Sequence, residues 1–259
     1  MATRAPRPLV WPYTVLSVAV LFGGWTLVTV EGWVSPLFMP TPLAVWRGFF
    51  DLADSGYNGV PLGWDVTISL VRVFAGFGVG AVCGSLLGLA MGTWKGLDAV
   101  ADPFIEFLRP LPQLGYLVLL IIWFGIGETS KIMLLFLTAL PVTAVAARDG
   151  VRGVPEQRVQ AARALGASSH QIFWLVILPA ALPEIFIGLR LAIGLVYATL
   201  IAAEILAGSD GIGWMVFNAG RFLRADFVFV GVILIGLMGV ALDRALVLAE
   251  RRIVHWAGR

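Results

Sequence analysis

The residue patterns that carry the common hydrolytic chemistries are missing from this sequence. A phosphate-binding P-loop requires a lysine directly after a glycine, and neither of the two lysines, Lys95 and Lys131, follows one. The patterns G-x-S-x-G and H-E-x-x-H are also absent. The two histidines, His170 and His255, have no cysteine or carboxylate cluster near them in the sequence. We therefore expect no catalytic residue, no metal site and no cofactor in this chain.

The segment 157–179 has the most informative spacing of residue types. Small residues precede Gly166, a pattern typical of a helix that ends at a glycine C-cap. Ser168 or Ser169 can cap a second, amphipathic helix, which we expect Pro179 to terminate. Two short helices joined by a tight turn predict a rigid projection from the membrane, whereas an ordinary loop would be more polar and less regular.

The composition indicates that lipid surrounds most of the chain. Hydrophobic residues make up 59% of the 259 residues and charged residues only 13%, with a mean hydropathy of +0.91. A soluble domain usually has roughly 45–50% apolar and about 25% charged residues. Only helices and closed barrels span lipid, and the continuous apolar runs of about 20 residues favour helices. We predict an all-α polytopic membrane protein.

Six apolar segments are long enough to cross the membrane. They cover approximately residues 12–31, 66–92, 98–124, 129–148, 183–207 and 227–251. The first follows Arg4 and Arg7 in the manner of a signal peptide. It is too long for one and lacks a cleavage pattern, so we expect it to be retained as a membrane helix.

Prolines predict two further features of these segments. The stretch Arg109–Pro112 contains two prolines, which predict a kink or break in the third segment. Between the first two segments, Thr41 and Pro42 predict the start of a short amphipathic helix that ends near Gly56. We expect this helix to lie along the membrane surface.

Basic residues are distributed unevenly between the two sides of the predicted membrane. With a cytoplasmic N-terminus, eleven of the eighteen lysines and arginines lie on the inner side, four on the outer side and three within the apolar segments. This imbalance favours cytoplasmic N- and C-termini and places residues 149–182 in the cytoplasm. It also explains the net charge of +2 without a nucleic-acid partner.

Charged residues inside the apolar segments are costly unless they are paired or face water. Four of them are candidates for the translocation pathway or its gate: Glu106, Arg109, Arg190 and Glu204. Glu106 and Arg109 are three residues apart and can pair. Arg72 and Glu204 lie at similar depth and can also pair, while Arg190 can extend to the cytoplasmic face. A purely structural role is the alternative for each of these residues.

Glycine recurs at every fourth position along the second segment. The positions are Gly76, Gly80, Gly84, Gly88 and Gly92. They form a ridge without side chains, along which another helix can approach closely. We interpret the ridge as a packing surface, and a surface that slides during transport is the alternative.

The spacing in 157–179 resembles the cytoplasmic loop of importer-type ABC permeases. In that family Glu-Ala-Ala is followed by three residues, a glycine, nine residues and Ile-x-Leu-Pro. The matching positions here are Gln160, Ala161, Ala162, Gly166, Val176, Leu178 and Pro179. Gln160 stands where the family usually has Glu, and Val176 where it has Ile. The resemblance implies that these seven residues couple the chain to an ATPase subunit.

The resemblance extends over nearly the whole chain and points to the taurine, sulfonate and nitrate permease group. The matching stretches are Ser35–Pro42, Asp102–Pro103, Arg109–Pro112, Trp123–Lys131, Leu178–Glu184, Ile201–Ile205 and Gly211–Val216. Within this group the chain looks most like taurine permeases. The implied fold is that of a type I ABC importer (MetI-like) permease, in a single domain over residues 1–259.

The resemblance also implies partners and a cargo. The assembly would contain two permease copies, two ATPase subunits that bind ATP and magnesium, and an external substrate-binding protein, in the bacterial inner membrane. The pathway would lie between the two copies, bordered by the third and fifth segments. The cargo would be taurine or another sulfonate, with nitrate or a pyrimidine or thiamine precursor as alternatives. An ion-coupled secondary transporter is a rival from a different class, but it predicts inverted repeats that we do not find.

Overall fold

The computed structural model describes residues 11–256, which are predominantly helical. In chain order the helices are α1 Trp11–Val30, α2 Pro42–Ser55, α3 Leu62–Thr93, α4 Lys95–Leu108, α5 Gln113–Phe124, α6 Glu128–Arg152, α7 Glu156–Ala164, α8 Ser169–Ile172, η1 Phe173–Ile177, α9 Leu178–Ala207, α10 Ile212–Arg221 and α11 Ala225–Ile253. Within residues 11–256 the extended pairing is limited to an isolated bridge between Tyr57 and Val60. The predicted all-α fold is confirmed.

Among residues 11–256, five helices are long and apolar enough to cross a membrane, namely α1, α3, α6, α9 (taken together with α8 and η1) and α11. The pair α4 and α5 passes the same test as a unit but is bent by 101°. The six predicted segments therefore correspond to five continuous helices and one broken one. Arg4, Arg7 and Arg259, which contribute to the predicted orientation, lie outside the described residues.

The chain divides into two compact units, so the prediction of a single domain stays a prediction. One unit comprises the chain up to residue 62 together with 215–233, and the other comprises 63–214 together with the chain from 234 onward. In the first unit, Thr41 caps α2 by accepting a hydrogen bond from the Ala44 amide at 3.1 Å. The α2 helix ends at Gly56, whose φ of 70° favours glycine. The predicted amphipathic helix is thus present with its predicted caps.

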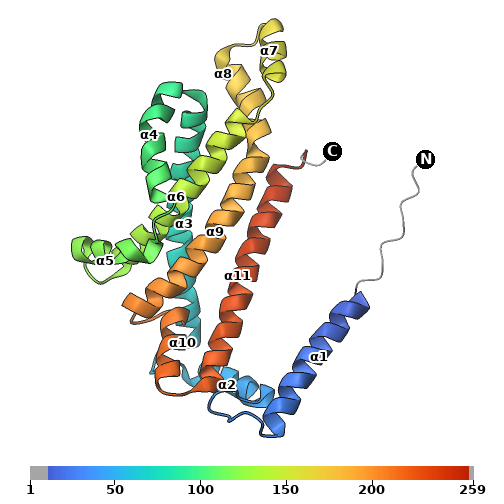
Figure 1. The fold of residues 1–259 in the computed structure, drawn as a ribbon, viewed down its shortest axis with the longest axis vertical. Coiled ribbons are helices and arrows are strands. Elements are labelled where there is room, and N and C mark those ends of the chain that lie inside the picture. The colour runs from blue at the N-terminus through green and yellow to red at the C-terminus, as the bar shows by residue number, and fades with distance from the viewer. Residues whose placement is uncertain (1–10, 257–259) are drawn as a thin grey trace. The chain divides into compact units, whose positions relative to one another are not determined.

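The core of the second unit is built by α3, α6, α9 and the later part of α11. Its buried members are Val73, Phe77, Ala81, Leu135, Ala139, Ala192, Ile193, Val196, Leu200 and Leu242. Figure 1 shows α3, α6 and α9 running alongside one another, with α7 and α8 projecting beyond one end of α6 and α9.

The glycine ridge of α3 packs against α6. A Cβ atom at Gly80 would lie 2.7 Å from the Cβ of Ala139, and the other four ridge glycines face α6 in the same way. By contrast Gly78, on another face of α3, has open space beside it. The predicted packing role of the ridge is confirmed.

Three ion pairs hold α4 against α6, one of them between Arg148 and Asp98 at 3.9 Å. Arg148 pairs with Asp102, and Arg152 pairs with Asp98. Because both acids lie on α4 and both arginines lie in the last part of α6, this end of the second unit is fixed immediately before α7 begins.

Candidate functional site

The segment 157–179 begins as two short helices that are capped by their own residues. Gly166 has a φ of 83°, and its amide donates to the carbonyl of Arg163 at 2.9 Å. Ser168 then accepts a hydrogen bond from the Gln171 amide at 3.3 Å, while the Gln171 side chain accepts one from the Ser168 amide at 2.8 Å. This reciprocal capping box fixes the start of α8. The predicted glycine C-cap and serine N-cap are both confirmed.

The outer part of this segment has no buried residues. Nothing in α7 is buried, and Gln160, Ala161 and Gly166 are exposed while Ala162 is half-buried. Gln160 donates to Glu156 at 3.0 Å. Leu165, at the tip, is 89% exposed. A leucine exposed to this degree on a rigid turn is suited to contact with a partner.

The sequence prediction that Pro179 terminates the second helix is wrong. The chain continues from α8 through a π-helical turn, η1, directly into α9. The amide of Leu178 donates to the carbonyl of Phe173, five residues earlier, so the hydrogen-bond register changes just before the proline, which has no amide to donate. Val176, Leu178 and Pro179 are half-buried at the base of the projection, away from its exposed tip.

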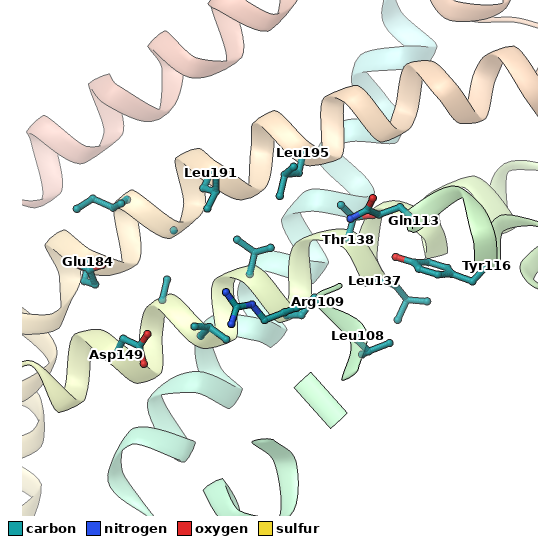
Figure 2. Close-up of a pocket in the computed structure, with 16 residues that line it drawn as sticks. Leu108, Arg109, Gln113, Tyr116, Leu137, Thr138, Asp149, Glu184, Leu191 and Leu195 are labelled. Atoms are coloured by element: carbon teal, nitrogen blue, oxygen red, sulfur yellow. The ribbon is translucent and has the colours of Figure 1, made fainter. Parts of the chain in front are cut away.

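A cavity of about 350 Å³ lies beside Arg109, where the third predicted segment breaks. It is lined by residues of α4, α5, α6 and α9 (Figure 2). Its lining residues are Leu108, Arg109, Gln113, Tyr116, Leu137, Thr138, Pro141, Val142, Val145, Ala146, Asp149, Glu184, Ile187, Gly188, Leu191 and Leu195. The break between α4 and α5 therefore brings Arg109 and the α5 side chains of Gln113 and Tyr116 to the wall of this cavity.

Acidic and neutral polar residues lie at opposite ends of this cavity. Figure 2 shows Asp149 and Glu184 at one end and Gln113 and Tyr116 at the other, with the Arg109 side chain between them. The cavity thus offers a cation, two carboxylates and neutral hydrogen-bonding groups to one small solute.

The four predicted pathway residues do not meet at one place. Glu106 accepts a hydrogen bond from Arg109 at 3.1 Å, as predicted from their spacing. Arg190 instead pairs with Asp243 on α11 at 3.0 Å and does not line the cavity. Arg190 therefore does not share this cavity with Arg109.

Glu204 is fully buried in a cluster of charges centred on Arg72. The Arg72–Glu204 pair, predicted from their similar depth, is present at 2.7 Å with both side chains fully buried. The guanidinium also donates to both carboxylate oxygens of Glu128 at 2.6 Å, and to Asp210 through a side-chain oxygen at 2.5 Å and the carbonyl at 3.2 Å. A solute therefore cannot contact the Glu204 side chain. Its geometry fits the structural alternative instead of the pathway role.

The partners of this cluster were missed by the sequence prediction. The Ser69 hydroxyl donates to Glu204 at 2.7 Å, and the Gly213 amide donates to the other oxygen of Glu204 at 2.9 Å. Asp65 accepts from the Gly211 amide at 2.8 Å. The sequence does contain one pattern that could have indicated this cluster. Several acidic residues lie at the outer ends of the apolar segments, at a depth similar to that of Arg72. Hydropathy gives their depth but does not show which of them face the same interior.

Comparison with known proteins gives a consistent result across most of the chain. The family described as "Binding-protein-dependent transport system inner membrane component" matches residues 80–255. The chain is 40% identical to the taurine transport system permease protein TauC of Escherichia coli, over 93% of this chain and 88% of that protein. It is 31% identical to the nitrate import permease protein NrtB of Synechocystis, over 97% of this chain and 94% of that protein.

A solved structure shares the fold. A chain of the MetNI methionine ABC transporter, in an inward-facing conformation, is 22% identical to this one. The match covers 85% of this chain and 99% of that chain, with a TM-score of 0.53. The matched parts thus have the same helical architecture.

Proposed function

The chain belongs to the family of binding-protein-dependent transport system inner membrane components, and we propose that it imports taurine or another short sulfonate. As a member of that family it is a multi-pass inner membrane permease subunit of an ABC importer. The cargo proposal combines the 40% identity to a taurine permease with the charge layout of the cavity beside Arg109.

The arrangement of charge in the cavity is the observation that carries the cargo proposal. Taurine has a sulfonate at one end and an ammonium group at the other. Arg109 and Gln113 suit the sulfonate, since a guanidinium binds oxyanions through paired hydrogen bonds. Asp149 and Glu184 suit the ammonium. Asp149 also accepts a hydrogen bond from Arg148 at 3.2 Å, whereas Glu184 has no hydrogen-bond partner among residues 11–256. Neither nitrate nor a sulfonate without an ammonium group has a cation for the acidic end of the cavity, so this end favours taurine over both.

We further propose that α7 and the turn after it transmit movement from a separate ATPase subunit, which binds ATP and magnesium. Gln160, Ala161, Ala162 and Gly166 lie on the exposed outer part of the projection. A capped, rigid element can transmit displacement that a mobile loop would absorb. Val176, Leu178 and Pro179 form its base and join it directly to α9.

The remaining subunits of the proposed assembly are inferred from the family to which the chain belongs. Two copies of this chain, two ATPase subunits and an external binding protein form the importer, with both termini in the cytoplasm. The pathway lies between the two copies, and the cavity beside Arg109 borders it on each side.

The cargo proposal is tested by uptake in a bacterial host that lacks its own taurine, sulfonate and nitrate importers. The chain is expressed with its cognate ATPase and binding protein, and uptake of taurine, ethanesulfonate and nitrate is measured. We expect saturable taurine uptake that a tenfold excess of nitrate leaves unchanged. The variants Arg109→Gln and Glu184→Gln should each reduce taurine uptake, and Glu184→Gln should affect ethanesulfonate, which has no ammonium group, much less.

Two results would contradict the proposal. Nitrate uptake without taurine uptake would assign the chain to the nitrate branch of the group. Taurine uptake that persists when the ATPase subunit is inactivated would instead support an ion-coupled transporter.

A further inference from the structure

A second, larger cavity lies between the end of α3 and the base of the α7–α8 projection. Its volume is about 930 Å³, near the upper end of the roughly 300–1,000 Å³ typical of ligand sites. The residues that line it are Leu86, Leu89, Ala90, Gly92, Thr93, Trp94, Val151, Val159, Arg163, Ser169, His170, Ile172, Phe173, Trp174, Ile177 and Leu178. No carboxylate is among these residues.

The depth of this cavity limits what can fill it. Its lining on α3 runs from Leu86 to Thr93, the last residue of that membrane-spanning helix. Seven residues of helix correspond to about 10 Å, so the cavity extends well into the apolar part of the span. A water-soluble subunit docked on the projection cannot reach that depth, whereas the acyl chains of a bilayer extend through it.

The mouth of the cavity has the chemistry of a membrane interface. Trp94 and Trp174 line it and are 67% and 53% exposed, and tryptophan is enriched where hydrocarbon meets the headgroups. Arg163 and His170 are exposed beside them, and Arg163 has no ion-pair or hydrogen-bond partner among residues 11–256. The mouth thus carries one fixed positive charge, an imidazole and the Ser169 hydroxyl.

The π-helical turn η1 forms one wall of the cavity. Phe173, Trp174 and Ile177 belong to the π-helical turn and all line the hollow. Trp174 also lies close to His170, with ring centroids 6.1 Å apart. Single π-helical turns are rare and occur frequently at functional sites.

We propose that this cavity binds an anionic phospholipid, with an acyl chain along Leu86, Leu89 and Ile177 and the headgroup phosphate at Arg163, Ser169 and His170. Apolar depth, interfacial tryptophans and an unpaired cation at the mouth each match one part of such a lipid. Because the cavity wall includes the base of the α7–α8 projection, the lipid binds at the joint between that projection and the spans. The site depends neither on the identity of the cargo nor on which side of the membrane the projection faces.

The test uses the full chain in lipid nanodiscs with photoreactive lipids. Phosphatidylglycerol and phosphatidylcholine that carry the same diazirine in the acyl chain are compared, and the labelled peptides are identified by mass spectrometry. Labelling of the peptides that contain residues 86–94 and 170–178 should be stronger with phosphatidylglycerol. Unlabelled phosphatidylglycerol should compete for it, whereas inorganic phosphate should not.

A matched pair of variants isolates the headgroup contact. Arg163→Gln should lower phosphatidylglycerol labelling about fivefold, the factor equivalent to roughly 1 kcal/mol per basic residue at an anionic surface. Arg158→Gln is the control, since Arg158 is an exposed arginine on the same helix that does not line this cavity. It should leave the labelling unchanged.

Three results would overturn the proposal. Equal labelling by the two lipids in the unmodified chain would indicate ordinary annular lipid. Equal effects of Arg163→Gln and Arg158→Gln would indicate a diffuse attraction to basic residues. Competition by inorganic phosphate would assign the mouth to a free anion instead of a lipid.

Discussion

Replacing Arg72 by methionine is expected to destabilise the chain more than any substitution at an exposed charge. All five guanidinium N–H donors of Arg72 are used, on Glu128, Glu204 and Asp210. The bonds tie α3 to the start of α6, the end of α9 and the loop that follows α9. Arg72→Met removes these bonds and leaves the Glu204 carboxylate buried without its cationic partner.

The magnitude follows from burial. Breaking a buried pair by removing one partner typically reduces the free energy of unfolding by about 3–5 kcal/mol. Both Arg72 and Glu204 side chains are fully buried, so we expect a loss in this range. Asp226→Asn is the control, because the Arg224–Asp226 pair at 3.0 Å is partly exposed and should contribute less than about 1 kcal/mol.

The assay is reversible unfolding in mixed detergent and SDS micelles, with a double-mutant cycle. Glu204→Gln removes the charge that Arg72→Met leaves unpaired, so the double variant should be more stable than the sum of the single effects predicts. We expect a coupling of about 1–3 kcal/mol. Additive effects, or a loss with Arg72→Met no larger than that of the Asp226→Asn control, would show that this cluster does not join the helices.

Three further predictions concern the glycines and the orientation. Gly166→Val should strain a position with a φ of 83° by about 1–3 kcal/mol and abolish uptake while the chain still inserts, as measured by transport and membrane expression. Gly80→Leu should destabilise the chain in the SDS unfolding assay because its Cβ would meet Ala139, whereas Gly78→Leu, which has open space beside it, should have little effect. In an otherwise cysteine-free chain, Ser55→Cys should react with an impermeant maleimide from outside the cell and Gln157→Cys only after lysis, and the reverse pattern would invert the proposed orientation.

Local chemistry predicted the local structure of this chain well. The caps at Thr41, Gly166 and Ser168 were predicted because each depends on residues only a few positions apart. The break at Arg109–Pro112 was predicted for the same reason, since a proline without an amide donor affects its own turn. The size of the bend, 101°, depends on what the two halves pack against and was not predictable.

Features that depend on tertiary packing were predicted only in part. The Arg72–Glu204 pair was expected from depth alone. Glu128 and Asp210 lie at the ends of other elements, and only the fold determines that their side chains point toward Arg72. Arg190 was a pathway candidate because it is a charged residue inside an apolar segment, yet it pairs with Asp243. Depth in a membrane is readable from hydropathy, whereas the face of a helix that meets a given neighbour is not.

The prediction at Pro179 failed for a different reason. Proline usually ends a helix because it has no amide to donate. Here a π-helical turn changes the hydrogen-bond register immediately before it, and α9 continues through the proline. The second helix of the projection, α8, therefore continues through η1 into α9 as one helix, and α7 joins it through the turn at Gly166.

Transport by the reconstituted importer shows whether ATP hydrolysed by a partner subunit drives import through α7. The chain, its ATPase subunit and its binding protein are placed in proteoliposomes, and uptake of labelled taurine is measured with and without ATP. Ala162 is half-buried on α7, and Ala162→Trp should prevent close approach of the ATPase there. We predict ATP-dependent uptake that Ala162→Trp abolishes while the chain still inserts, whereas uptake by the chain alone, or full uptake with Ala162→Trp, would contradict the account.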